Sequence, residues 1–350
     1  MKRIVFTGGG TAGHVMPNLA LISALRGEFD CVYIGGDGAE KDLCASRGIP
    51  FYRVDTVKFR RDAIFANFSI PFKLRACVGS ARKILDELKP DLIFSKGGYV
   101  SLPAVLAAKR SGVPLVCHES DLSPGIVTKL SKNRAEKILC AFEDTTTLFK
   151  NGVYVGTPLG KALFDPNAKT RGAKLFPASG KKPVLLIMGG SSGAAALNEI
   201  TVRALPELTK LFDVIHLTGK SKSGASGNID GYTKLDFCND MPALYATVDV
   251  AITRAGANSL AELAATGTPA VAVPLEKASR GDQIENADYY EKRGAVKVLR
   301  ERDMTEKTLL ETTLCVYNSR AAYTAAARRL KIDGTEKICS IIKEEINRNQ

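Results

Sequence analysis

A glycine-rich segment near the start of the chain carries a histidine that could act as a base. Residues 8–14 read Gly-Gly-Gly-Thr-Ala-Gly-His and follow the apolar run 4–6. Glycines at such a turn let backbone N–H groups approach an anion, and a helix N-terminus favours negative charge. Histidine is suited to take a proton near neutral pH. The segment predicts an anion site with His14 as candidate base, although a plain tight turn would use the same glycines.

A dinucleotide site at this turn is disfavoured by the acids that follow it. Such a site needs an acidic residue at the end of the second strand, about 20 residues further on. Asp30 precedes the predicted second strand, and Asp37 lies beyond Gly35 and Gly36. Neither position suits a contact with a ribose.

A second glycine-rich loop, Gly-Gly-Ser-Ser-Gly at 189–193, matches the G-x-S-x-G pattern of hydrolases. That fold orders its triad as Ser, then Asp or Glu, then His. The only histidine after Ser191 is His216, inside an apolar strand, where a core role is expected. A phosphate-binding turn with a hydroxyl donor is therefore favoured.

Two further turns combine a strand end with polar residues. Residues 254–262 form a small-residue turn and a helix beginning near Asn258 or Ser259, with Glu262 one turn inside. Backbone donors there suit a diphosphate, and a carboxylate suits a ribose diol, although a glutamate in a first turn also complements the helix dipole. At 280–283, Asp282 and Gln283 suit sugar hydroxyls, or Asp282 is the N-cap of a helix toward Tyr290.

Residues 59–83 interleave basic residues with aromatic and aliphatic ones. Such a segment can seat apolar groups in a membrane interface while its cations meet anionic headgroups. An amphipathic helix packed on the core and a nucleic-acid patch are the alternatives.

The elements that position these residues alternate strand and helix. Continuous apolar runs predict strands covered on both faces, hence parallel sheets in a doubly wound α/β architecture. The first helix is expected over 18–25, residues 158–182 are expected to be linker and loop, and isoleucines near the C-terminus predict an amphipathic terminal helix. The predicted strands are 4–6, 31–34, 91–94, 113–117, 138–142, 183–188, 214–217, 250–253 and 270–273.

The composition of the chain limits the classes of partner that it could bind. The 350 residues suggest about two domains, and the net charge of +12 favours an anionic partner. No nucleic-acid recognition module is present, so nucleic acid is excluded as a partner. The eight cysteines form no CxxC pair, and Asp-x-Asp and H-E-x-x-H are absent, so a metal-independent site in a reducing compartment is expected. No apolar run is long enough for a spanning helix.

Together these motifs resemble the MurG family, the peptidoglycan N-acetylglucosaminyltransferases of the GT-B fold. The resemblance covers nearly the whole chain and rests on the order and spacing of the segments at 8–14 with Pro17, 97–101, 118–119, 189–194, 257–262, 283 and 286–287. It implies two doubly wound, Rossmann-like parallel-sheet domains facing across a cleft. Residues 1–158 would face acceptor and membrane, residues 159–334 would bind UDP-GlcNAc, and a terminal helix at 335–350 would return to the first domain.

The resemblance also implies an activity without a cofactor or a metal. It is inverting transfer of GlcNAc from UDP-GlcNAc to the C4 hydroxyl of MurNAc-pentapeptide on undecaprenyl diphosphate (lipid I to lipid II), by a peripheral protein at the cytoplasmic face of the cell membrane. The anionic membrane surface would be met through residues 59–83. Asp121 stands where the family commonly has Asn, and Gly160 where it commonly has Arg. A paralogous transferase with another lipid-linked acceptor, a UDP-GlcNAc 2-epimerase and a binding protein without chemistry remain the alternatives.

Site roles follow from the same resemblance. Thr11, Ala12 and Gly13 would face the sugar diphosphate, His14 would be the base, and Asp121, after His118-Glu119, would contact substrate. For the donor, the Cys238 backbone would meet the uracil and Glu262 the ribose. Ala257, Asn258, Ser259 and Ser191 would line the diphosphate. Asp282 and Gln283 would contact the GlcNAc.

Overall fold

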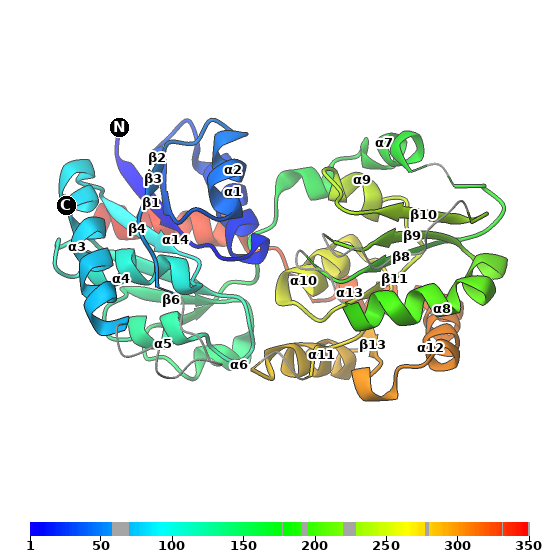
Figure 1. Cartoon of the computed structure of the whole chain (residues 1–350). Coiled ribbons are helices and arrows are strands. Elements are labelled where there is room, and N and C mark those ends of the chain that lie inside the picture. The colour runs from blue at the N-terminus through cyan, green and yellow to red at the C-terminus, as the bar shows by residue number, and fades with distance from the viewer. Residues whose placement is uncertain are drawn as a thin grey trace. The chain divides into compact units, whose positions relative to one another are not determined.

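The computed structural model describes residues 1–57, 70–176, 178–190, 195–219, 229–276, 280–330 and 332–348. The chain divides into two compact units (Figure 1). Unit 1 consists of Met1–Gly160 and Asp333–Gln350, and unit 2 of Lys161–Ile332.

Unit 1 is built on a seven-stranded sheet of order β3-β2-β1-β4-β5-β6-β7, parallel at every pairing. Its strands are β1 (Arg3–Thr7), β2 (Asp30–Gly35), β3 (Phe51–Arg53), β4 (Leu92–Ser95), β5 (Leu115–Glu119), β6 (Lys137–Cys140) and β7 (Gly152–Tyr154). Its helices are α1 (Ala12–Leu25), α2 (Ala39–Ala45), α3 (Ile70–Leu88), η2 (Tyr99–Ser101), α4 (Leu102–Ala108), α5 (Ile126–Ser131), α6 (Glu143–Thr146) and α14 (Thr335–Arg348).

Helices cover both faces of this sheet, as the continuous apolar runs predict. Ile4 and Phe6 of β1 enter a core shared with α1 and α14, whereas Val5 between them enters a core shared with α3 and α4. Successive side chains of a strand point to opposite faces, so both must be apolar when both are covered. The doubly wound parallel architecture is thereby confirmed for unit 1.

The first helix begins earlier than predicted. α1 starts at Ala12, not at residue 18, and Pro17 lies inside it. Proline and the preceding glycines removed the apolar signal for a helix start. Pro17 lies beyond the first turn and removes one backbone hydrogen bond, and the helix continues through it.

Unit 2 has a six-stranded sheet of order β10-β9-β8-β11-β12-β13, also parallel at every pairing. Its strands are β8 (Val184–Met188), β9 (Asp213–Leu217), β10 (Tyr232–Leu235), β11 (Val250–Thr253), β12 (Ala270–Ala272) and β13 (Val296–Val298). Its helices are η3 (Lys161–Phe164), α7 (Ala168–Leu175), α8 (Ala195–Leu211), α9 (Met241–Tyr245), α10 (Ala257–Thr266), α11 (Asp282–Lys292), η4 (Glu301–Asp303), α12 (Glu306–Asn318) and α13 (Arg320–Arg328).

The stretch 158–182 is not only linker and loop. It contains η3 and α7, so that prediction was wrong for these two elements. Within unit 2, Arg171 of α7 donates from Nε to Asp240 Oδ2 at 2.9 Å and also pairs with Asp165. Polar tertiary contacts of this kind leave no apolar period in the sequence.

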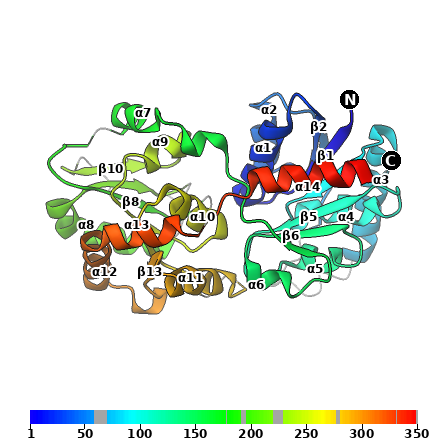
Figure 2. The same cartoon turned by 180° about the vertical axis from the view of Figure 1, so that it is seen from behind.

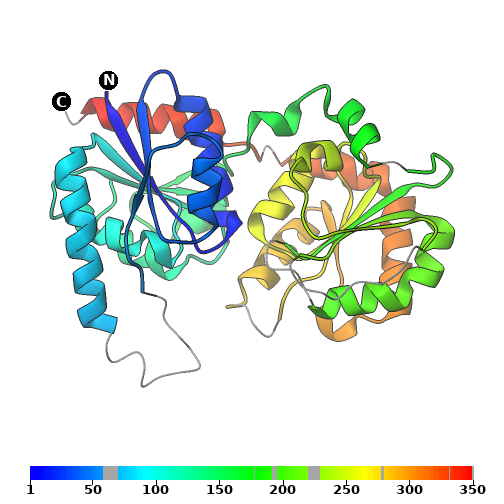
Figure 3. The ribbon, with the colours of Figure 1, turned by 45° about the horizontal axis from the view of Figure 1, so that its top comes forward.

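The terminal helix α14 packs beside α1 within unit 1 (Figures 2 and 3). Ile338, Ile342 and Ile346 are at most 2% exposed and join the core formed by β1 and α1. Lys343 pairs with Glu28 at 2.7 Å. The spacing of the isoleucines explains this placement, since it gives the helix one apolar stripe.

Candidate functional site

The first glycine-rich loop joins β1 to α1 at the carboxyl edge of the unit 1 sheet. Thr11 is the N-cap of α1, and Ala12 and Gly13 are its first residues. Gly10 has φ of +85°, and a methyl group placed there would lie 2.6 Å from the Tyr99 ring. The loop thus depends on glycine at position 10, and it places the N-terminus of α1, whose dipole favours an anion, at this edge of the sheet.

His14 lies in the first turn of α1 and is half-buried. Its Nδ1 lies 3.0 Å from Thr11 Oγ1. A methyl group on Gly98 would lie 3.3 Å from the His14 ring and 2.5 Å from the Gly9 carbonyl. The β4 loop therefore approaches the first loop closely, and it does so because Gly98 has no side chain.

A buried polar cluster occupies the end of β5. Glu119 accepts hydrogen bonds from the backbone N–H groups of Asp121 at 3.1 Å and Gly125 at 2.9 Å, which shapes the loop that carries Asp121. Lys96 is 2% exposed and contacts Ser120 Oγ. Burial lowers the pKa of Lys96 to about 8, while the nearby Glu119 and Asp121 carboxylates oppose that shift.

His118 belongs to the same edge but is held as a neutral core group. Its Nε2 lies 2.8 Å from the Gly156 carbonyl oxygen and so donates to it. Burial, and secondly the Lys96 charge, hold the pKa of His118 well below its usual value. A buried histidine of lowered pKa is poorly suited to carry a proton away from a substrate.

In unit 2, the N-terminus of α10 lies at the carboxyl end of β11. Gly256 is the N-cap, and Ala257, Asn258 and Ser259 form the first turn. The backbone N–H groups of a first helical turn point toward the helix N-terminus and suit a diphosphate. Nearby, Arg254 forms a buried ion pair with Glu301 at 2.5 Å.

Glu262 lies one turn into α10, beside α9. Its Oε2 accepts a hydrogen bond from Tyr245 Oη at 2.9 Å. Burial raises the pKa of Glu262, and the Tyr245 hydroxyl works against that rise. One carboxylate oxygen is thus oriented by the protein, and Oε1 has acceptor capacity for a diol.

The remaining candidates of unit 2 lie near the same edge. Cys238 is buried just before α9, whose N-cap Asp240 accepts from Ala243 N at 3.0 Å. Gln283 Oε1 accepts from Leu275 N at 3.0 Å. Asp282 is not the N-cap of α11: that position is Gly281, with φ of +88°, and Asp282 Oδ1 instead accepts from Arg280 N at 2.9 Å.

Ser191 falls outside the described residues, as do its neighbours through residue 194. Helix α8, which follows these residues in the sequence, is described from Ala195. Asn198 of α8 donates to the Thr218 carbonyl at 3.0 Å, and its Oδ1 lies 3.0 Å from His216 Nε2. His216 Nδ1 lies 3.1 Å from Tyr232 Oη. His216 is fully buried, which confirms its predicted core role.

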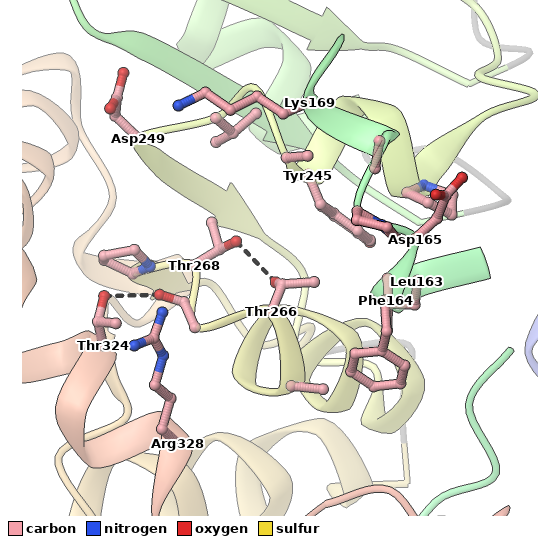
Figure 4. A pocket seen from close by; sticks show the side chains of 18 of the residues that line it. Leu163, Phe164, Asp165, Lys169, Tyr245, Asp249, Thr266, Thr268, Thr324 and Arg328 are labelled. Atoms are coloured by element: carbon pink, nitrogen blue, oxygen red, sulfur yellow. Dashed lines mark hydrogen bonds between the residues drawn. The ribbon is translucent and has the colours of Figure 1, made fainter. Parts of the chain in front are cut away.

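A cavity of about 530 Å³ in unit 2 lies away from these residues (Figure 4). Its walls include Asp249, which precedes β11, and Thr268, which precedes β12. Those are the amino ends of the strands, whereas α10 begins at the carboxyl end. The cavity and the donor-site candidates therefore lie at opposite ends of the strands. Tyr245 lies between them, since its ring lines the cavity and its hydroxyl donates to Glu262.

Within the described ranges, no three His, Cys, Asp or Glu side chains are grouped as metal ligands. None of the described helices has both the length and the apolar character needed to cross a membrane.

The sequence matches two family models. Residues 4–140 match the glycosyltransferase family 28 N-terminal domain, and residues 184–343 match the glycosyltransferase family 28 C-terminal domain. The chain belongs to glycosyltransferase family 28. It is an enzyme of the glycosyltransferase class, and its two parallel-sheet units are those of the GT-B fold.

Two relatives of this family 28 chain have the same name. A protein of Lachnoclostridium phytofermentans is 41% identical over 98% of this chain and 99% of its own length, and one of Lachnospira eligens is 40% identical over the same shares. Both are named UDP-N-acetylglucosamine–N-acetylmuramyl-(pentapeptide) pyrophosphoryl-undecaprenol N-acetylglucosamine transferase. The crystal structure of Acinetobacter baumannii MurG is 28% identical, covers 98% of this chain and 100% of its own, and superposes with a TM-score of 0.75.

Tyr245 and Lys96 are polar residues near these candidates that the sequence patterns of this glycosyltransferase do not single out. Tyr245, which orients Glu262, follows Ala243 and Leu244 and has the pattern of an ordinary core position. Lys96 gave a usable signal, because it is a lone charge directly after the apolar strand β4 and before two glycines.

Acid is expected to destabilise the chain through His216. Burial lowers its pKa to about 4, whereas the unfolded chain protonates near 6.5, so the unfolded state binds more protons between these values. Stability should be full above pH 6.5 and fall toward pH 4, by up to about 3 kcal/mol. Denaturant unfolding of wild type and His216→Gln at several pH values measures this.

The His216→Gln variant should lose less stability than wild type over the same pH interval. Its absolute stability at pH 7 is not the relevant quantity, since the substitution also changes the contacts with Asn198 and Tyr232. Identical pH dependence in the two proteins would show that His216 does not titrate in this way.

Proposed function

We propose that this chain transfers GlcNAc from UDP-GlcNAc to the C4 hydroxyl of MurNAc-pentapeptide on undecaprenyl diphosphate, with inversion at the anomeric carbon. One observation carries the proposal: relatives about 40% identical over 98% of the chain bear the name of that transferase. We place the protein peripherally on the cytoplasmic face of the cell membrane, where such an acceptor would be met.

The proposed reaction is a single displacement with His14 as general base. The acceptor hydroxyl loses its proton to His14, its oxygen attacks the anomeric carbon, and the bond to the UDP oxygen breaks. For Nε2 to take that proton, Nδ1 must carry a hydrogen and donate it to Thr11 Oγ1, which lies 3.0 Å away. Thr11 thus fixes the tautomer as well as the ring.

Unit 2 is assigned the donor. The first turn of α10, at Ala257, Asn258 and Ser259, receives the diphosphate and stabilises charge on the departing UDP. Glu262 accepts from the ribose diol, and the Cys238 backbone meets the uracil. Asp282 and Gln283 contact the GlcNAc hydroxyls, with Ser191 beside the diphosphate.

Unit 1 is assigned the acceptor. The N–H groups of Thr11, Ala12 and Gly13 suit an anionic sugar diphosphate at the start of α1. Asp121 contacts substrate from a loop that Glu119 holds through two backbone hydrogen bonds. The buried Lys96 adds positive charge beneath the same edge.

Membrane contact is assigned to the basic-aromatic segment 59–83, of which residues 59–69 lie outside the described part of the chain. In the described part, Phe72 near the start of α3 is 81% exposed and is followed by the exposed Lys73 and Arg75. An exposed phenylalanine among cations suits an anionic lipid surface.

Phe72→Glu is expected to weaken binding to anionic vesicles about tenfold or more, because it removes apolar burial and adds a repelled charge. Co-sedimentation with phosphatidylglycerol–phosphatidylcholine vesicles measures this. Phe164→Glu, at a phenylalanine of unit 2 that is 49% exposed, is the matched control and should bind as wild type. Equal binding by all three proteins would remove α3 from the membrane surface.

The proposed reaction is tested by UDP release from UDP-GlcNAc, with a lipid I analogue compared against other lipid-linked and free acceptors. Release should require the muramyl acceptor, and the product should contain the new disaccharide. Release with a different acceptor alone would indicate a paralogous transferase, and UDP-ManNAc formed without acceptor would indicate an epimerase.

A further inference from the structure

We infer that Glu40 is a positioning residue of the first glycine-rich loop: its buried carboxylate occupies the concave side of that loop and fixes the backbone that carries Thr11 and His14. The inference rests on the proposed function, in which His14 is the base. Glu40 is the second residue of α2 and is 1% exposed.

The carboxylate is bonded to two separate glycine turns. Its Oε2 accepts from Gly10 N at 3.4 Å, and its Oε1 accepts from Gly36 N at 3.2 Å. Gly10 belongs to the loop after β1, and Gly36 directly follows β2. Glu40 therefore ties the ends of two neighbouring parallel strands together at their carboxyl edge.

The surrounding glycines leave room for the Glu40 carboxylate. A methyl group on Gly9 would lie 2.7 Å from the carboxyl carbon of Glu40, and one on Gly38 would lie 2.6 Å from Oε2. One on Gly35 would lie 2.9 Å from the Glu40 Cγ. Since real side chains do not approach so closely, the absence of side chains at these glycines is what admits Glu40 to the loop.

No cation forms an ion pair with Glu40 within the described ranges. Two backbone N–H groups and its place in the first turn of α2 compensate the charge instead. A buried carboxylate is a costly way to fill space, because it must be desolvated and then hydrogen-bonded in full. An apolar side chain would fill the same space with a smaller desolvation penalty. We therefore attribute the carboxylate at this position to its hydrogen bonds with the Gly10 and Gly36 amides.

The hydrogen bond from Gly10 to Glu40 engages one amide of the loop within the protein itself. In dinucleotide-binding folds, the glycines after the first strand receive a phosphate. Here an internal carboxylate already takes the Gly10 amide. The start of α1, which follows Gly10, keeps the positive end of its dipole for a substrate anion. Because Gly10 precedes Thr11, and Thr11 holds His14 at 3.0 Å, movement of Gly10 is passed directly to the base.

The test is Glu40→Gln, with Asp42→Asn as matched control. The glutamine has nearly the same size, but its amide group turns an NH₂ toward one of the two backbone N–H groups, so one bond is lost. Asp42 is exposed on the same helix, and its change removes the same charge without touching the loop. With UDP-GlcNAc and a lipid I analogue, kcat of Glu40→Gln should fall about tenfold, since small misplacements of a catalytic group are costly.

The Michaelis constant for UDP-GlcNAc and the calorimetric affinity for UDP should stay within about twofold, because Glu40 lies in unit 1. Asp42→Asn should match wild type in all three quantities. Glu40→Asp keeps the charge but cannot span both amides, so it should show a similar fall in kcat even if the glutamine variant does not fold.

The results separate the two proposals. An inactive wild type would overturn the proposed function. An active wild type with unchanged kcat in both Glu40 variants would overturn the positioning role. A parallel loss of UDP affinity would also overturn it, because that pattern indicates general damage to the fold.

Discussion

Replacing His14 with alanine is expected to lower kcat for GlcNAc transfer by a factor of about 10² to 10⁴, the usual contribution of a positioned general base. The residue is half-buried in the first turn of α1, with Nδ1 3.0 Å from Thr11 Oγ1. Removing the imidazole leaves the acceptor hydroxyl to lose its proton to water. The UDP-release assay at saturating concentrations of both substrates measures the loss.

Thr11→Val is the companion to this experiment. Valine keeps the shape of threonine but cannot accept a hydrogen bond, so the imidazole loses the partner that fixes its tautomer. A smaller fall in kcat, about tenfold, is expected, together with a changed pH profile. UDP affinity should be unaffected in both variants. Normal turnover in His14→Ala would exclude this residue as the base.

The strands of the two sheets were predictable where both of their faces are covered. The predicted strand at 250–253 coincides with β11, all four residues of which are buried. The edge strands β3, β7, β10 and β13 were missed. β10 has the half-exposed sequence Tyr-Thr-Lys-Leu, and β3 has only three residues. Edge strands need no continuous apolar run, so their place in the sheet follows from tertiary pairing rather than from local sequence.

The site residues also differ in how far the sequence predicts them. Residues that act through a local turn, such as those at 8–14 and 257–262, are recognisable because the turn itself must be built from small residues. Glu40 acts on a loop 30 residues away in sequence, and this depends on the pairing of β1 with β2. In the sequence it has the pattern of any acid in a first turn of a helix. The role of Tyr245 is hidden in the sequence for the same reason. Its hydrogen bond to Glu262 of the next helix forms only when α9 and α10 pack together.

Glu262→Ala is expected to raise the Michaelis constant for UDP-GlcNAc about 100-fold while kcat at saturating donor changes little. Hydrogen bonds to a charged group contribute about 1.5–3 kcal/mol each, and the ribose diol can donate two. A contact remote from the reacting bond is made equally in ground state and transition state, so its loss appears in binding. The 2′-deoxy analogue of UDP-GlcNAc supplies the decisive comparison.

Wild type should discriminate strongly against the 2′-deoxy donor, whereas Glu262→Ala should accept both donors almost equally. The same penalty in both proteins would place the ribose elsewhere. Acid adds a further check. Burial raises the pKa of Glu262, so the carboxylate is protonated, and donor affinity lost, at a pH above the usual glutamate range. Tyr245→Phe removes the hydrogen bond that opposes this rise, so its loss of affinity should begin at a still higher pH, while Glu262→Ala should show no such step.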